Sequence, residues 1–73
     1  MDKPISVLLF EDDEGQAFLT KEALEKDGFV VEICETGREG LDRLFVKDYQ
    51  VYLIDMQLPD IKGIEVLRRI KTI

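Results

Sequence analysis

Short apolar runs alternate along the chain with longer segments of mixed polarity. The apolar runs cover residues 5–10, 29–34 and 51–54. Continuous apolar runs of this length are typical of strands that are covered on both faces, as in parallel sheets. Glu32 places a charge inside the second run, which suits a strand at the edge of a sheet better than one at its centre. The pattern therefore predicts three strands, with the second at an edge.

The segments between the strands have helical periodicity. A helix is predicted from about Asp13 to Asp27, with an apolar side formed by Ala17, Leu19, Ala23 and Leu24. Gly28 follows at the point where a helix commonly ends on a residue with positive φ. Thr36 and Glu39 form a capping box, which predicts a second helix with the apolar positions Leu41, Leu44 and Phe45. Gly63 stands at the entry to a third helix, whose apolar positions are Ile64, Leu67 and Ile70.

The predicted order is β-α-β-α-β-α, with short connections. Alternating elements of this kind form parallel sheets with right-handed crossovers, so the fold class is α/β. A length of 73 residues corresponds to one domain or part of one, and we expect residues 1–73 to form a single unit. Such a short domain buries only roughly 60% of the surface of its unfolded chain, so its core is small.

Charge and composition narrow the possible partners. Sixteen acidic and ten basic residues leave a net charge of −6, which argues against direct nucleic-acid binding and suits a cation or a basic partner surface. Cys34 is the single cysteine and histidine is absent, so no disulfide within the chain and no Cys/His metal site is possible. The six-residue apolar run near the N-terminus is too short for a signal peptide or a membrane span. We therefore expect a cytoplasmic location without membrane contact.

Two of the predicted strands end in acidic residues. Glu11 and Asp12 follow the first strand, and Asp55 follows the third. The carboxyl ends of parallel strands lie at one edge of the sheet, where ligands bind, so adjacent first and third strands would bring these carboxylates together. Three close carboxylates raise one another's pKa unless a cation lies among them. Oxygen ligands of this kind select Mg²⁺, Mn²⁺ or Ca²⁺, and one carboxylate could act as a nucleophile.

A structural role is the simpler explanation for acidic residues after a strand. They commonly cap the following helix, and Asp13 and Glu14 fit that role. The coincidence with Asp55 at a second strand end, followed by a loop with Pro59, favours a binding site for the remaining acids.

Segments 7–14 (VLLFEDDE) and 53–63 (LIDMQLPDIKG) resemble the first and third signature segments of response-regulator receiver domains. The likeness extends from Ile5 to Lys71, and the Asp-x-x-Leu-Pro-Asp-x-x-Gly stretch beginning at Asp55 is its most specific part. The resemblance implies a flavodoxin-like doubly wound parallel sheet, here truncated to three strands in the order 2-1-3 with three helices.

The resemblance also assigns roles to individual residues. Asp55 matches the aspartate that such domains phosphorylate, and Asp12 matches a direct ligand of Mg²⁺ (or Mn²⁺). Glu11 matches the acid that reaches the metal through water, and the backbone carbonyl of Gln57 matches the position that completes the coordination. Pro59 and Gly63 match residues that shape the loop into the third helix.

The implied function is a phosphoacceptor module of two-component signal transduction. Asp55 would receive a phosphoryl group from a histidine kinase or phosphotransfer protein, so the domain would be a signalling substrate and not an enzyme in the usual sense. The family fold has five strands and five helices. The Ser or Thr of its fourth strand and the Lys of its fifth have no counterpart here, so we expect impaired signalling output if the chain ends at Ile73.

Two alternatives remain on the sequence alone. A half-domain, natural or engineered, could self-associate without signalling, and its apolar third strand, 51–54, predicts a homodimer through that edge. A phosphatase with Asp55 as nucleophile is disfavoured, because such sites usually place a second acid two residues later, where this chain has Gln57.

Overall fold

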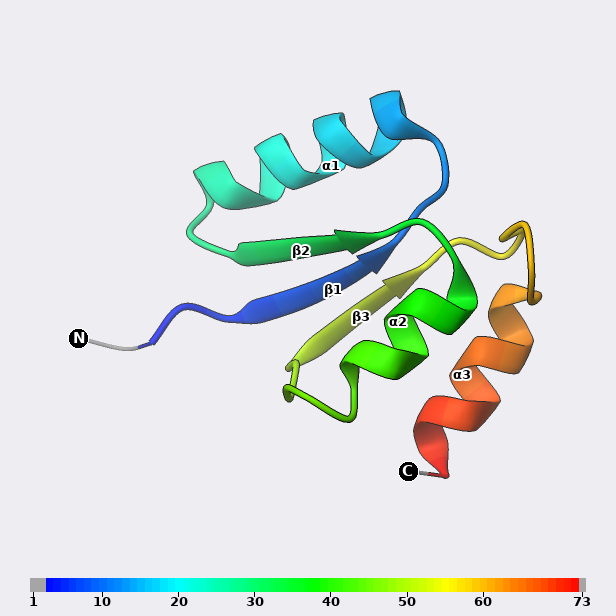
Figure 1. Cartoon of the computed structure of the whole chain (residues 1–73). Helices are drawn as coiled ribbons and strands as arrows, with labels where there is room; N and C mark the ends of the chain where they lie inside the picture. Colours follow the sequence, from blue (N-terminus) through cyan, green and yellow to red (C-terminus); the bar gives the residue numbers. More distant parts are fainter. Residues whose placement is uncertain (1–2, 73) are drawn as a thin grey trace.

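The computed structural model describes residues 3–72, and it contains three strands and three helices in alternation (Figure 1). The ends of the predicted unit, residues 1–2 and 73, lie outside the described part. The elements are β1 (Ser6–Phe10), α1 (Glu14–Lys26), β2 (Val30–Cys34), α2 (Gly37–Arg43), β3 (Val51–Ile54) and α3 (Gly63–Lys71). Their order confirms the predicted α/β pattern. Within the described range, no helix is both long and apolar enough to cross a membrane.

The three strands form one parallel sheet in the order β2-β1-β3. Leu9 of β1 is level with Ile33 of β2 on one side and with Leu53 of β3 on the other. Both the predicted order 2-1-3 and the edge position of the strand that carries Glu32 are confirmed. Because β1 is central, its end lies between the ends of the other two strands.

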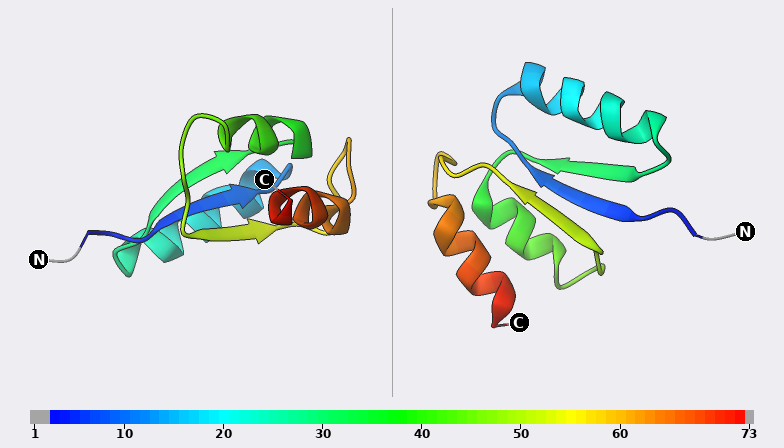
Figure 2. Two further views of the ribbon diagram at one scale, coloured as in Figure 1. Left: turned by 90° about the horizontal axis from the view of Figure 1, so that it is seen from below. Right: turned by 180° about the vertical axis from the view of Figure 1, so that it is seen from behind.

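The central strand contributes to two apolar clusters, one on each face of the sheet. Leu8 and Phe10 are fully buried with Val66 of α3 on one face, while Val7 and Leu9 pack with Ala17 of α1 on the other. Figure 2 shows α1 on one side of the sheet and α2 on the other. Side chains alternate between the faces of a strand, so a strand covered on both sides needs apolar residues at every position.

The predicted apolar side of α1 is only half right. Ala17 is buried and Leu24 packs against the sheet, but Ala23 is exposed and Leu19 retains 60% of its accessible surface. One helix face can contact one sheet over only a narrow stripe, so residues spaced by seven, such as Ala17 and Leu24, lie on it together. Leu19 belongs to a different face.

The predicted apolar positions of α2 and α3 are also only partly buried. In α3, Val66 is fully buried, whereas Ile64 and Leu67 remain 46% and 39% exposed. Phe45 is 79% exposed because α2 ends at Arg43 and the chain turns before Phe45 can join its apolar stripe. The helical period could be predicted from the amino-acid pattern, but the pattern could not show which of two adjacent apolar stripes meets the sheet.

Side chains at the helix ends behave as their residue types predict. Asp13 caps α1 by accepting a 2.9 Å hydrogen bond from the backbone N–H of Gln16. Gly28 has φ +92°, the left-handed conformation expected where α1 ends. Thr36 caps α2 through the backbone N–H of Glu39, while the Glu39 carboxylate accepts from the N–H of Glu35. The capping box is thus present, with its return hydrogen bond displaced by one residue.

Glu32 joins β2 to α2 and to the segment before β3. Its carboxylate accepts hydrogen bonds from Arg43 (2.9 Å), Tyr49 (2.7 Å) and Lys47. The hydrogen bond from Lys47, reinforced by those from Tyr49 and Arg43, holds the pKa of Glu32 below its usual range. Tyr49 also packs edge-on against Tyr52 in the core. Arg43 is therefore a structural partner of Glu32.

Candidate functional site

Three carboxylates meet at the carboxyl edge of the sheet. Glu11, Asp12 and Asp55 each offer an oxygen, and these oxygens lie within 4.8 Å of one another. The sheet hydrogen bonds continue one residue past the strands and fix two of the backbones, because the Glu11 N–H donates to Cys34 O at 2.9 Å and the Asp55 N–H donates to Phe10 O at 3.1 Å. The convergence predicted from adjacent strand ends is therefore present.

The cluster has the electrostatics of a cation site. Burial raises the pKa of Glu11, and the charges of Asp55 and Asp12 raise it further, although a hydrogen bond from the Asp13 N–H acts in the opposite direction. Glu11 and Asp55 are half-buried, while Asp12 is exposed. A hard divalent cation would relieve this repulsion, and an all-oxygen donor set suits Mg²⁺ or Mn²⁺. The residues present thus fit such an ion.

The loop after β3 is closed at its base. The Gly63 N–H donates to Met56 O at 3.0 Å, and Gln57 forms an isolated antiparallel bridge with Lys62. A side chain at position 63 would place its Cβ 2.3 Å from Asp55 O, so only glycine permits this approach. The Asp55 carboxylate accepts from the Gln57 N–H at 3.0 Å. This base therefore determines how Asp55 and the Gln57 backbone are presented.

Asp60 belongs to the Asp-x-x-Leu-Pro-Asp-x-x-Gly stretch of the loop, and its carboxylate is tied to α2, which that motif does not predict. One oxygen accepts from the Gly37 N–H at 2.8 Å and from the Ile61 N–H at 2.9 Å, and the other accepts from the Arg38 N–H at 2.9 Å. Burial would raise the pKa of Asp60, yet the hydrogen bonds from Arg38 and Gly37 hold it below its usual range. No periodicity or spacing signals a hydrogen bond between residues 23 positions apart. An Asp that directly follows Pro59 in a tight loop is the one local hint.

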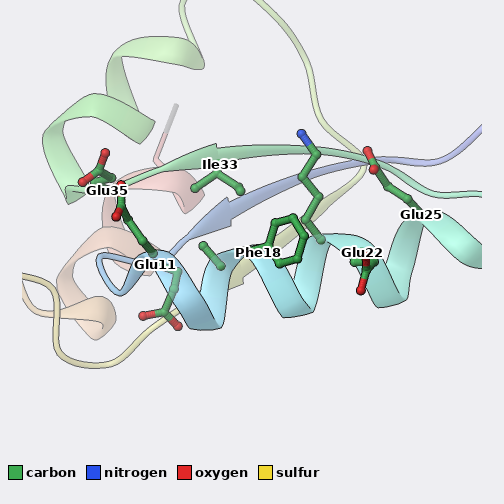
Figure 3. A pocket seen from close by; sticks show the side chains of 9 residues that line it. Glu11, Phe18, Glu22, Glu25, Ile33 and Glu35 are labelled. Atoms are coloured by element: carbon green, nitrogen blue, oxygen red, sulfur yellow. The ribbon is translucent and has the colours of Figure 1, made fainter.

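Two grooves meet at Glu11. The smaller, of about 330 Å³, lies between α1 and β3, and its lining includes Thr20, Leu53 and Asp55. The larger, of about 640 Å³, lies beside β2 on the other flank of α1. Figure 3 shows Phe18 in the middle of this larger groove, with Glu11 and Glu35 toward one end and Glu22 and Glu25 toward the other. Phe18 is 61% exposed.

A known protein family matches nearly the whole chain. The model of the response regulator receiver domain matches residues 7–73. The matched range contains the acidic cluster, the loop after β3 and all three helices.

Curated relatives match over most of this chain but over a small part of their own length. The cell cycle transcriptional regulator CtrA of Caulobacter vibrioides is 42% identical over 65 residues, which are 89% of this chain and 28% of that protein. The response regulator ArlR of Staphylococcus epidermidis is 33% identical over 90% of this chain and 30% of its own length. The transcriptional regulatory protein TrcR of Mycobacterium tuberculosis is 37% identical over 93% of this chain and 26% of its own length. The chain thus spans less than a third of these relatives.

Solved structures give the same picture of the fold. A response regulator receiver domain (CheY-like) from Methylobacillus flagellatus superposes with a TM-score of 0.93 and 27% identity, covering 96% of this chain and 59% of that one. A chain from the crystal structure of histidine kinase ThkA in complex with response regulator protein TrrA has a TM-score of 0.88 and 29% identity, covering 93% of this chain and 59% of its own length. The three-stranded unit described here therefore corresponds to rather more than half of each matched chain.

Proposed function

Because this chain belongs to the response regulator receiver domain family, we propose that it is a phosphoacceptor module of two-component signalling in which Asp55 is phosphorylated. The observation that carries the proposal is the convergence of Glu11 and Asp12 with Asp55 at the carboxyl edge of the sheet. The phosphodonor is a histidine kinase or phosphotransfer protein, in line with the matched chain from a kinase–regulator complex.

The transfer is a substitution at phosphorus. A carboxylate oxygen of Asp55 forms a new O–P bond while the P–N bond to the donor histidine breaks. The electron pair of that bond stays on the imidazole nitrogen, which takes up a proton. The acid–base demand on the domain is small, so positioning and charge stabilisation supply most of the catalysis. The loop base fixes the orientation of Asp55 through the hydrogen bond from the Gln57 N–H.

Mg²⁺ or Mn²⁺ is the cofactor that the acidic cluster would hold. We assign Asp12 and Asp55 as direct ligands, Glu11 as an acid that acts through water, and the Gln57 backbone carbonyl as a further ligand. When bound, such an ion neutralises charge on the transferring phosphoryl oxygens. Burial, together with the nearby charges of Asp55 and Asp12, raises the pKa of Glu11, and this crowding of carboxylates supports the assignment.

The proposal is limited to the receiver function of residues 1–73, which we take as one partial receiver domain. Two of the matched relatives are named as transcriptional regulators, but the chain covers under a third of each. With a net charge of −6, we propose no direct contact of this unit with nucleic acid. A cytoplasmic location fits both the proposed partner and the single cysteine.

Phosphorylation by acetyl phosphate tests the proposal. The polypeptide, with any residues encoded beyond Ile73, is incubated with acetyl phosphate and Mg²⁺, and the adduct is measured by intact-protein mass spectrometry. We expect the wild type to gain one phosphoryl group and Asp55→Asn to gain none. Asp48→Asn is a matched control, because Asp48 is an exposed aspartate outside the acidic cluster. Undiminished labelling of Asp55→Asn would reject the assignment.

Self-association is a second candidate function. Within the described residues, β3 pairs with β1 alone, and Leu53 on it is 37% exposed. An open strand edge can pair with the same edge of a second copy, which would give a twofold dimer with a continuous six-stranded sheet. Sedimentation velocity at micromolar concentration tests this. A folded monomer by circular dichroism and ultracentrifugation would contradict it.

A further inference from the structure

We propose that Asp60 is a positioning residue for the phosphoacceptor site, because its carboxylate fastens the tip of the loop after β3 to the first turn of α2. This inference rests on the proposed function of Asp55. It concerns a residue that does not belong to the acidic cluster. Its basis is the set of hydrogen bonds that Asp60 accepts from Gly37 and Arg38.

The hydrogen bonds account for the free N–H groups at the start of α2. A helix leaves its first N–H groups without partners inside the helix. In α2, Asp60 takes those of Gly37 and Arg38, and Thr36 takes that of Glu39. The Gly40 N–H begins the helical pattern by donating to Thr36 O at 3.2 Å. Asp60 therefore accepts two of these three capping hydrogen bonds, although it lies 23 residues away from Gly37 in the sequence.

The same hydrogen bonds fix the loop that carries the site. The base of the loop is held by the Gly63–Met56 hydrogen bond, and its middle is held by Leu58, which is buried in the core. Asp60 is the attachment at the tip. With base, middle and tip attached to three different parts of the fold, the loop has little freedom to change the path of its backbone at Gln57.

Small displacements at such a site are costly. A shift of about 1 Å in a positioning contact can change a rate by about a hundredfold, and loss of partners outside a metal's ligand shell typically weakens binding by about ten- to a hundredfold. We expect the lower end of that range for Asp60, because the base of the loop stays attached without it.

Thr36 offers a matched control for the helix itself. Thr36→Ala removes the other side-chain cap of α2, the 3.0 Å hydrogen bond from the Glu39 N–H, but leaves the loop after β3 untouched. Asp60→Ala removes both a cap and the tie to the loop. Asp60→Asn keeps one acceptor oxygen for Gly37 and Ile61, but places an N–H₂ group against the Arg38 N–H, so it should give an intermediate effect.

Two measurements separate positioning from stability, and both use the polypeptide with any residues encoded beyond Ile73, at a temperature where all variants are folded. Titration with MgCl₂ alone gives the metal affinity, and amide hydrogen exchange at Gly63 reports the base of the loop. We expect Asp60→Ala to weaken Mg²⁺ binding about tenfold and to speed Gly63 exchange, while Thr36→Ala changes Mg²⁺ affinity less than about twofold. For Asp60→Asn, both the Mg²⁺ affinity and the Gly63 exchange rate should lie between those of Asp60→Ala and the wild type. If Asp60→Ala does not fold, Asp60→Asn takes its place in the comparison with Thr36→Ala.

The initial rate of phosphorylation by acetyl phosphate should follow the same order. The positioning role would be overturned if Asp60→Ala and Thr36→Ala changed the Mg²⁺ affinity equally, or if neither changed it. Failure of this inference is distinguishable from failure of the proposed function. If Asp55→Asn blocks labelling while Asp60→Ala behaves like the wild type, only the inference about Asp60 is wrong. Labelling of Asp55→Asn would reject the proposed function itself.

Discussion

Gly63→Ala is expected to disrupt both the stability of the fold and the acidic site. Gly63 is the first residue of α3, and its N–H donates to Met56 O. A Cβ added there would lie 2.3 Å from Asp55 O and 2.7 Å from Met56 Cα. Both atoms are backbone atoms, so no side-chain rotation can relieve the overlap.

The magnitude follows from this geometry. A carbon approaches a carbonyl oxygen to roughly 3.3 Å, so the two segments must separate by about 1 Å, enough to lengthen the Gly63–Met56 hydrogen bond beyond its useful range. Overpacking costs about 1–3 kcal/mol and a lost hydrogen bond about 1 kcal/mol, while the better helix propensity of alanine offsets about 1 kcal/mol. We therefore expect a net loss of about 1–3 kcal/mol in the free energy of unfolding.

Urea unfolding followed by circular dichroism, with and without millimolar Mg²⁺, measures both effects. Gly28→Ala is the control, because it strains a backbone with φ +92° by about 1–2 kcal/mol while its Cβ would meet no heavy atom within 4 Å. Gly28 lies in the turn between α1 and β2, at the opposite end of the sheet from the acidic cluster (Figure 1). Mg²⁺ should stabilise Gly28→Ala as it does the wild type, but stabilise Gly63→Ala less.

Two outcomes would refute this reasoning. If Gly63→Ala is as stable as the wild type, the loop base is not closed as tightly as these distances require. If Gly63→Ala is destabilised but keeps the full Mg²⁺ response, the loop base does not control the acidic site.

Three further predictions concern other parts of the fold. Millimolar Mg²⁺ should raise the melting temperature of the wild type but not of Asp12→Ala, and equal shifts in both would reject the metal site. Glu32→Gln should lower the free energy of unfolding near neutral pH by about 1–2 kcal/mol, because Glu32 accepts from two cations and a tyrosine. The folded-state pKa of Glu32 is lowered, so its contribution to stability is present above the ordinary carboxyl pKa of 4.5 and is lost as pH falls through the lowered value. If Glu32→Gln stayed less stable than the wild type in strong acid, this prediction would be contradicted. Cys34 is fully buried, and burial raises its pKa to about 12. Iodoacetamide at neutral pH should therefore modify Cys34 only when urea unfolds the protein, and mass spectrometry measures this modification.

The element order could be read from the sequence because it depends on local patterns, whereas the strand order 2-1-3 followed from the resemblance to receiver domains. Apolar runs of four to six residues define strands buried on both faces, and the alternation with helices specifies a parallel sheet. Choosing the buried stripe of each helix required the tertiary structure. Leu19 and Phe45 are as apolar as the residues that are buried, but Leu19 lies on a different face of α1 and Phe45 lies beyond the end of α2.

The acidic cluster was predictable for a similar reason. Glu11, Asp12 and Asp55 directly follow strands, and parallel strands bring their carboxyl ends to one edge whatever lies between them in the chain. Asp60 and Glu32 were not predictable in the same way. Each joins separate elements through a few side-chain hydrogen bonds, and such contacts depend on where α2 packs, which no local pattern specifies. The sequence by itself thus determined which carboxylates gather, while the packing of α2 against the loop decided which carboxylate holds that loop in place.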